Sequence, residues 1–143
     1  MAQLLFCLLA ENIITDSATN NTSIINVIEN ISVNAELPVN FPLMQLVISW
    51  ERETPMGNAE PLSFRIRIRY QSGNFFGRDF RIDAPIPADK DRIKSIVRME
   101  GIPLNETGKM EFLIEKESAN GRWIIVKTIP LNIQSTATPT VAS

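Results

Sequence analysis

The sequence predicts an all-β protein, and three observations lead to this prediction. Residues 62–71 alternate strictly between apolar and polar side chains, so as a strand this segment would bury one face and expose the other. Turn-forming clusters recur along the chain and separate apolar or alternating runs. Asn120-Gly121 lies between two such runs, and this pair tolerates the positive φ angles of a tight hairpin. Together these patterns predict a single antiparallel β-sandwich of about seven or eight strands.

The runs between the turns give the expected strands in chain order. They span residues 3–14, 23–33, 43–53, 62–71, 75–82, 92–100, 109–117 and 122–133. Ile93, Ile96 and Val97 also have helical spacing, but we expect a strand over 93–99 and leave open one helical turn before it. The sandwich should occupy residues 1–134, and the Ser/Thr/Ala/Pro-rich tail, 135–143, should be disordered.

Alternation within two neighbouring strands predicts the side chains of the core. The even-numbered residues face one way in both strands, and nearly all of them are apolar. The expected inward set is Met44, Leu46, Ile48, Trp50, Leu62, Phe64, Ile66, Ile68 and Tyr70. A sandwich of this kind would resemble immunoglobulin or C2-like domains.

Length, charge and cysteine usage limit the classes of protein. The chain has 143 residues, enough for one domain, and a net charge of −2, which argues against nucleic-acid binding. The apolar start, Leu4–Leu9, lacks a basic leader and is far shorter than a membrane span. We therefore expect a cytoplasmic protein with neither a nucleic-acid nor a membrane partner, and Cys7 agrees because a lone cysteine excludes an intramolecular disulfide.

The chain contains no histidine. This removes the Ser-His-Asp and Cys-His mechanisms, the commonest general base at neutral pH, and most zinc sites. Cys7 has neither a partner cysteine nor a neighbouring cation in the sequence, so we interpret it as a small buried hydrophobe of the first strand. We expect no cofactor and no catalytic residue.

A row of arginines is the most conspicuous charged feature. Arg65, Arg67 and Arg69 share one strand face, and Arg78 and Arg81 lie on the presumed hairpin partner. Guanidinium groups match phosphate and carboxylate geometry, so one interpretation is an anion-binding platform. The other is a solvated sheet face whose charges pair with nearby acids, and we favour it. The candidate acids are Asp79, Glu111, Glu115 and Glu117.

Acidic residues offer two further interpretations. Asp83, Asp89 and Asp91 flank one loop, as in calcium-binding sandwich loops, but Lys90 and Arg92 would oppose a divalent cation. A pair of carboxylates, alone or with a metal, could in principle run an enzyme reaction. With sixteen acids in the chain, the sequence singles out no such pair.

The first strand is apolar on both faces. Leu5, Cys7 and Leu9 would face the core, while Leu4, Phe6 and Leu8 would form a second row. Soluble proteins rarely leave such a row bare, so either the loop at 38–42 or another subunit should cover it. We expect that Leu4, Phe6 and Leu8 can support self-association.

Four segments carry a resemblance to a known family. They are residues 5–16 (LFCLLAENIITD), 22–31 (TSIINVIENI), 96–104 (IVRMEGIPL) and 107–114 (TGKMEFLI). They resemble the Cys-containing first strand, the second strand and the approach to the last hairpin in small uncharacterised bacterial proteins grouped as a domain of unknown function. Met110 stands where the family pattern has an aromatic residue. The resemblance implies a β-sandwich over most of residues 3–133 and implies no activity.

The function that these patterns favour is a non-catalytic binding or assembly module, with a homodimer or another protein as partner. Two alternatives remain open at this stage. One is recognition of an anionic ligand by the face that carries Arg65, Arg67 and Arg69, and the other is an enzyme that works through carboxylates or a bound metal.

Overall fold

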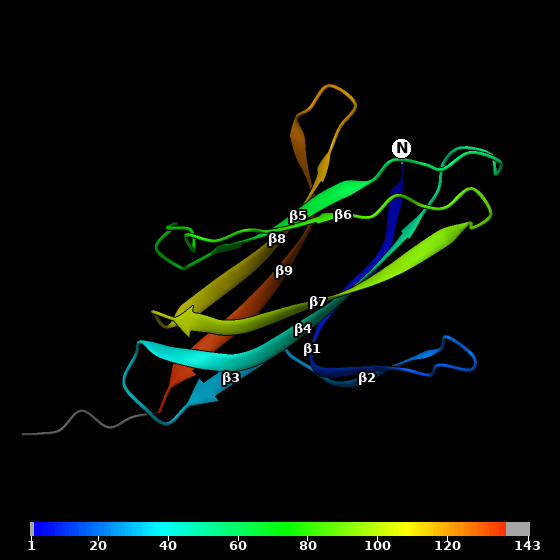
Figure 1. Ribbon diagram of the computed structural model, residues 1–143. Helices are drawn as coiled ribbons and strands as arrows, with labels where there is room; N and C mark the ends of the chain where they lie inside the picture. The colour runs from blue at the N-terminus through cyan, green and yellow to red at the C-terminus, as the bar shows by residue number, and fades with distance from the viewer. Residues whose placement is uncertain (1, 137–143) are drawn as a thin grey trace, which may run out of the picture.

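The structure, a computed structural model, describes residues 2–136 and places two β-sheets around one core (Figure 1). The strands are β1 (Gln3–Thr15), β2 (Thr22–Val27), β3 (Asn30–Val33), β4 (Val39–Glu51), β5 (Ser63–Arg69), β6 (Phe80–Asp83), β7 (Arg92–Leu104), β8 (Gly108–Glu117) and β9 (Trp123–Ser135). The described residues form no helix, so the helical turn that the sequence left open before residue 93 is absent. None of these residues forms a helix that could span a membrane.

Sheet A has the strand order β2-β1-β4-β7, and sheet B has the order β3-β9-β8-β5-β6. All neighbours are antiparallel except β3 and β9, which run parallel with Asn30 opposite Asn132 and Val33 opposite Ser135. The expectation of seven or eight strictly antiparallel strands is therefore wrong in two respects. The structure has nine strands, and sheet B is mixed.

The core lies between the two sheets and contains the predicted inward set. All nine of those side chains are buried, and they belong to one hydrophobic cluster with side chains from both sheets. Trp50 of sheet A meets Phe64 of sheet B with ring centroids 5.2 Å apart. The alternation that predicted these residues is confirmed because β4 and β5 are regular over this stretch, so every second side chain points inward.

The run expected over 23–33 is two strands in different sheets. Asn26 has a φ of 55°, a left-handed conformation that interrupts an extended chain. The Ile28 N–H still bonds the Leu9 carbonyl of sheet A, whereas the Glu29 carbonyl accepts a hydrogen bond from Asn132 of sheet B. The chain therefore crosses from one sheet to the other between these two neighbours.

Other boundaries also differ from the expected ones. β4 begins at Val39, so most of the segment 38–42 is strand paired with the end of β7, and it is not a cover for the first strand. β6 starts only at Phe80. The two predicted turns are present, with Gly73 and Gly121 at positive φ. Ser135 ends β9, while most of the tail expected over 135–143 lies outside the described residues.

The first strand bends and takes part in two pairings. Gln3–Ala10 pairs with β4, whereas Ala10–Thr15 pairs with β2 and leaves the plane of the sheet with it. The resulting β1–β2 hairpin extends to the right beneath β4 and β7 in Figure 1. It packs Ile13 and Ile24 against Val47 on the outer face of sheet A. The fold thus gives sheet A an outer layer that sheet B lacks.

Candidate functional site

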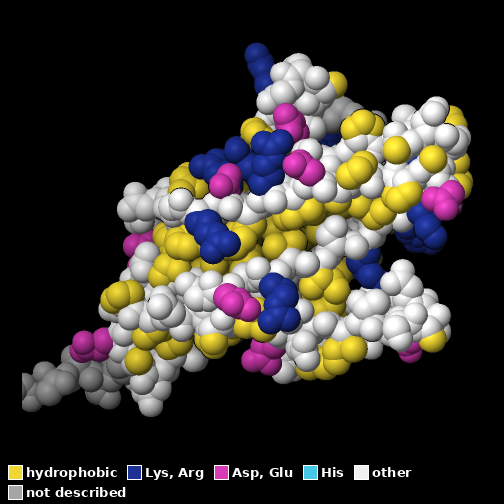
Figure 2. Space-filling model, in the orientation of Figure 1, with side chains coloured by type: hydrophobic (Ala, Val, Ile, Leu, Met, Phe, Trp, Pro, Cys, Tyr) yellow, Lys and Arg dark blue, Asp and Glu magenta, His cyan; other side chains and the backbone are white. Residues whose placement is uncertain are grey.

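The arginine row lies on the outer face of sheet B, and its charges are paired. Arg65 contacts Glu115 at 2.9 Å, and Arg67 approaches the same carboxylate at 3.7 Å. Arg69 contacts Glu111 at 2.9 Å across β5 and β8. Basic and acidic side chains interleave over this layer in Figure 2. Glu111 and Glu115 are among the acids that the sequence predicted as partners on a solvated face, and they compensate the positive charge of the arginines.

Aromatic rings occupy the remaining space between these arginines. The Arg65 guanidinium lies 4.4 Å from the centroid of the Trp123 ring, and Arg81 lies 5.3 Å from the same ring. Arg67 stacks over Phe75 at 3.9 Å, and Arg78 stacks over Phe80 at 5.0 Å. Arg81 also pairs with Glu117 at 3.4 Å. An incoming anion would have to compete with these contacts.

The three aspartates do not assemble into a metal site. Asp83 accepts a hydrogen bond from the Ser63 hydroxyl at 2.6 Å and lies 3.5 Å from Arg81. The Ser63 hydrogen bond is the largest cause that lowers the pKa of Asp83. Between residues 2 and 136, no three His, Cys, Asp or Glu side chains gather as a metal ion would require.

A β-bulge changes the two faces predicted for β1. Leu4 pairs with Trp50 and Phe6 pairs with Ser49, so Leu5 is an extra residue between them. Leu4 therefore packs against the core and Leu5 is exposed, the reverse of the expected facing. Cys7 and Leu9 are buried, as expected.

Apolar side chains of β1 and β7 remain exposed on the outer face of sheet A. Phe6 is 42% exposed and Leu8 37% exposed, and Ile96 of β7 is also 37% exposed. Leu8 and Ile96 flank Val47 in one cross-strand row, and Phe6 lies two residues from Leu8. We call Phe6, Leu8 and Ile96 the apolar strip. Leu4 is not part of it.

The β1–β2 hairpin covers the middle of this face and leaves the strip at its margins. Ala10, Ile13, Val47 and Ile24 form a second small apolar cluster beneath the hairpin. The turn is held by Asp16, whose Oδ1 accepts hydrogen bonds from the N–H groups of residues 18 and 19. The cover of the first strand is therefore internal in part, but it comes from this hairpin and not from residues 38–42.

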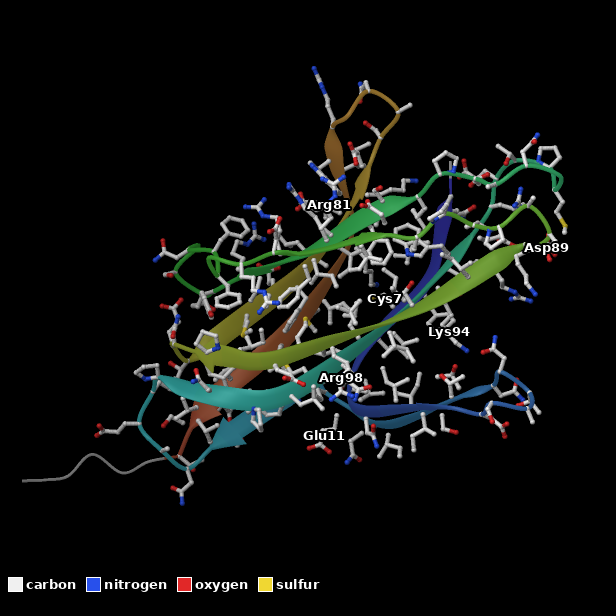
Figure 3. The ribbon with its side chains drawn as sticks, in the orientation of Figure 1. Cys7, Glu11, Arg81, Asp89, Lys94 and Arg98 are labelled. Carbon is white, nitrogen blue, oxygen red and sulfur yellow. The ribbon has the colours of Figure 1, made fainter. Side chains whose placement is uncertain are left out.

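A cleft of about 750 Å³ opens between the hairpin turn and the edge of sheet A. Phe6 and Ser49 of the sheet lie at its base, and residues 19–22 of the hairpin form one wall. Its opposite wall carries Lys90, Arg92 and Lys94. Lys94 projects from β7 toward the hairpin (Figure 3), where its Nζ donates a hydrogen bond to the Asn20 carbonyl at 3.0 Å. Figure 2 shows a hollow beside the hairpin at the right of the view, with basic side chains along its upper margin.

A buried arginine fixes the wall that carries Lys90. The Arg52 guanidinium donates to the main-chain carbonyls of Lys90 at 2.7 Å and Pro87 at 2.6 Å. It also donates to the carbonyls of Pro55 and Asn58, each at 3.0 Å. Charge-assisted hydrogen bonds are stronger than neutral ones, so Arg52 locks two loops together beside the cleft.

Glu60 holds the chain at residues 53–54 through hydrogen bonds to its carboxylate. Its carboxylate accepts hydrogen bonds from the Thr54 N–H at 2.9 Å, the Thr54 hydroxyl, and the Glu53 N–H at 3.2 Å. Burial alone would raise the pKa of Glu60, but these hydrogen bonds favour the charged form and lower the pKa below its ordinary value. The loops at residues 52–60 and 87–90 are thus held by two buried charged groups that the sequence analysis did not single out.

Cys7 is part of the core, as interpreted from the sequence. Burial raises the pKa of its thiol from 9.0 to about 12, although Lys127 opposes part of this shift. A thiol with such a pKa is almost wholly protonated at neutral pH and is a poor nucleophile.

The arrangement defines an all-β protein with two sheets and a hairpin layer over one of them. The chain belongs to a family of unknown function: residues 5–134 match the model described as "Family of unknown function (DUF6941)". No curated protein matches it. Among solved structures, an immunoglobulin-like protein from Pseudomonas aeruginosa aligns over 94% of this chain and 97% of its own, with 9% identity and a TM-score of 0.39.

Proposed function

We propose that this protein is a non-catalytic assembly module that pairs with a second copy of itself through the outer face of sheet A. The observation that supports this proposal is the apolar strip, whose three side chains remain more than a third exposed despite the hairpin cover. Phe6, Leu8 and Ile96 lie at the margins of the part of this face that the hairpin covers, where a second copy can contact them.

The charges around the strip favour a second copy as the partner. On the outer face of β7, Arg92 and Lys94 precede the strip residue Ile96 and Arg98 follows it. Glu51 and Glu100 lie on the same face, and Glu100 pairs with Arg98 at 3.4 Å. A face that carries apolar side chains and charges of both signs can pair with a copy of itself. A twofold axis can therefore set the acids of one copy against the cations of the other.

A non-catalytic role is supported by what the polar groups already do. The chain has no histidine, and Glu111 and Glu115 are held in ion pairs with arginines of β5. These ion pairs hold both carboxylates against the arginines of the sheet, which suits a structural role. The same pairs make the arginine row a weaker candidate for anion recognition than its sequence suggested.

We also infer that the fold is an immunoglobulin-like sandwich with an added hairpin. The crossing of the chain between the sheets at residues 28 and 29 supports this inference, as does the shared core. Comparison of an experimental structure with immunoglobulin domains would test it. A strand order that cannot be superposed on theirs would contradict it.

The assembly proposal is tested by exchanging two strip residues for serine. The variant Phe6→Ser/Leu8→Ser removes apolar surface from the proposed contact while leaving the core untouched. Burying one such side chain contributes roughly 1.5–3 kcal/mol, so losing two of them should convert the dimer into a monomer. Light scattering measures the mass, and circular dichroism checks that the fold is retained.

A matched control is available on the other sheet. Ile124 and Ile125 of β9 are 49% and 52% exposed, so Ile124→Ser/Ile125→Ser removes comparable apolar surface elsewhere. This control should remain dimeric. A wild-type protein that is monomeric at millimolar concentration, or a control that dissociates as readily as the strip variant, would contradict the proposal.

A further inference from the structure

The cleft beneath the hairpin concentrates positive charge that has no internal counter-ion. Lys90, Arg92 and Lys94 line it, and its lining contains no acidic side chain. None of these three cations forms an ion pair within residues 2–136. This contrasts with Arg65 and Arg69 of sheet B, which are both paired. The nearest acid in the sheet register is Glu51, which lies opposite Arg92 and is exposed.

Two hydroxyl-bearing residues, Thr22 and Ser49, also line the cleft. The Oγ1 atom of Thr22, in the hairpin wall, is buried and has no hydrogen-bond partner among the described residues. A buried hydroxyl without a partner costs stability, but this atom is not exposed to the cleft and we assign it no contact with a ligand. Ser49 at the base adds a second hydroxyl, which makes only a long 3.4 Å hydrogen bond to the Ile93 carbonyl.

The base of the cleft is apolar as well as polar. The Phe6 side chain contributes an exposed ring beside Ser49. The volume of about 750 Å³ lies in the range of small-molecule sites, and such sites combine an apolar surface with a few fixed polar groups. Arg52 fixes the loop of Lys90, and Asp16 fixes the turn opposite it, so both walls are held in place.

We propose that this cleft binds a small organic anion, with its phosphate or carboxylate group against Lys90, Arg92 and Lys94 and its apolar part on the ring of Phe6. The geometry assigns Lys94 the central role, because it comes from the sheet and reaches the hairpin across the cleft. This inference goes beyond the assembly proposal, but the cleft shares Phe6, Arg92 and Lys94 with the face proposed for assembly, so both properties are measured in the same samples.

Titration of the full chain with three aromatic probes tests the inference. Phenyl phosphate and benzoate carry the two kinds of anionic group, and benzyl alcohol is the neutral analogue. Amide NMR shifts should show saturable binding of at least one anion at the amides of Ser49, Lys94 and residues 19–22. Comparison of the two anions identifies the preferred group. Benzyl alcohol should bind at least about tenfold more weakly because it lacks the charge.

Three variants test whether the anion binds next to the cations of this cleft. Lys94→Gln keeps a donor for the Asn20 carbonyl but removes the cation, so binding should weaken about tenfold. Glu51→Gln removes the acid opposite Arg92 and should strengthen binding. Lys109→Gln removes a cation of β8 that is absent from the cleft lining and should change nothing. Heteronuclear spectra confirm that each variant is folded.

Three results would overturn the inference. The first is the absence of saturable shifts with both anions at millimolar concentration. The second is equal binding of benzyl alcohol, and the third is equal weakening by Lys94→Gln and Lys109→Gln. Sedimentation of the same samples reports the dimer separately, so failure of anion binding is distinguished from failure of assembly.

Discussion

The ammonium group of Lys94 donates a hydrogen bond to the main-chain carbonyl of Asn20 at 3.0 Å, and this contact ties the β1–β2 hairpin to the edge strand β7. The two residues are 74 positions apart in the chain. Apart from this bond, the hairpin rests on the small apolar cluster around Val47. The position of the hairpin therefore depends on few contacts.

Removing this bond should loosen the hairpin without unfolding the sheets. Lys94→Met keeps the apolar stem but not the donor, and a hydrogen bond of this kind contributes roughly 1 kcal/mol. Hydrogen exchange at Ile24 and its neighbours in β2 should become about fivefold faster, while exchange in β8 stays unchanged. Equal acceleration in both strands would show that the bond contributes to global stability instead.

Glu60 predicts a specific dependence of stability on pH. Its folded-state pKa lies below the ordinary value of 4.5, so the unfolded state takes up a proton first as the pH falls. The stabilisation by its hydrogen bonds is therefore complete above about pH 4.5 and is lost as the pH falls through the lowered value.

Urea unfolding of wild type and Glu60→Gln across pH 7 to pH 3 measures this dependence. The variant should be less stable at pH 7, because the amide is a weaker acceptor for Thr54. The difference between the two proteins should shrink at low pH. A difference that stays constant over the whole range would contradict the assigned role of the charge.

Cys7 should be unreactive in the native state. With a thiol pKa near 12, reaction with a disulfide reagent at pH 8 should be slow until urea unfolds the chain and exposes the thiol. The unfolded thiol ionises near pH 9 and the buried one does not, so native stability should fall as the pH rises from about 9 towards 12. Stoichiometric labelling of the folded protein within minutes would contradict this burial.

Two glycines provide a matched test of backbone constraint. Gly108 has a φ of +106°, and an added Cβ would lie 2.7 Å from the Oε1 atom of Gln71, which accepts a hydrogen bond from Lys109. Gly108→Ala should therefore cost roughly 1–3 kcal/mol. Gly77 has open space around its Cα and no left-handed φ, so Gly77→Ala should be nearly neutral in thermal unfolding. Equal costs would contradict the constraint at Gly108.

The sequence predicted regular strands well and irregular ones poorly, for a physical reason. Alternation identifies the buried face of β5, where Phe64, Ile66 and Ile68 are all buried. The same rule failed in β1 because one extra residue at a bulge exchanges the two faces. Positions 4 and 5 both carry leucine, so the exchange does not change the apolar pattern. Identical side chains on both sides of the bulge leave no signal in the composition.

The cleft could not be predicted because its walls are distant in sequence. Residues 19–22 and 90–94 meet only when β1 bends and the hairpin folds over sheet A. Lys90, Arg92 and Lys94 do alternate along the chain, which is a weak signal of one charged face. The arginine row, by contrast, was visible at once, but its acid partners come from β8, and only the sheet register of the fold brings them into contact.

Methyl NMR of the wild-type protein during dilution tests the central claim most directly. If two copies meet through the outer face of sheet A, the methyl signals of Leu8 and Ile96 shift as the dimer dissociates. Those of Ile124 and Ile125 on sheet B should stay constant. Shifts confined to Ile124 and Ile125, or no shift at any of the four between millimolar and micromolar concentration, would contradict assembly through the apolar strip.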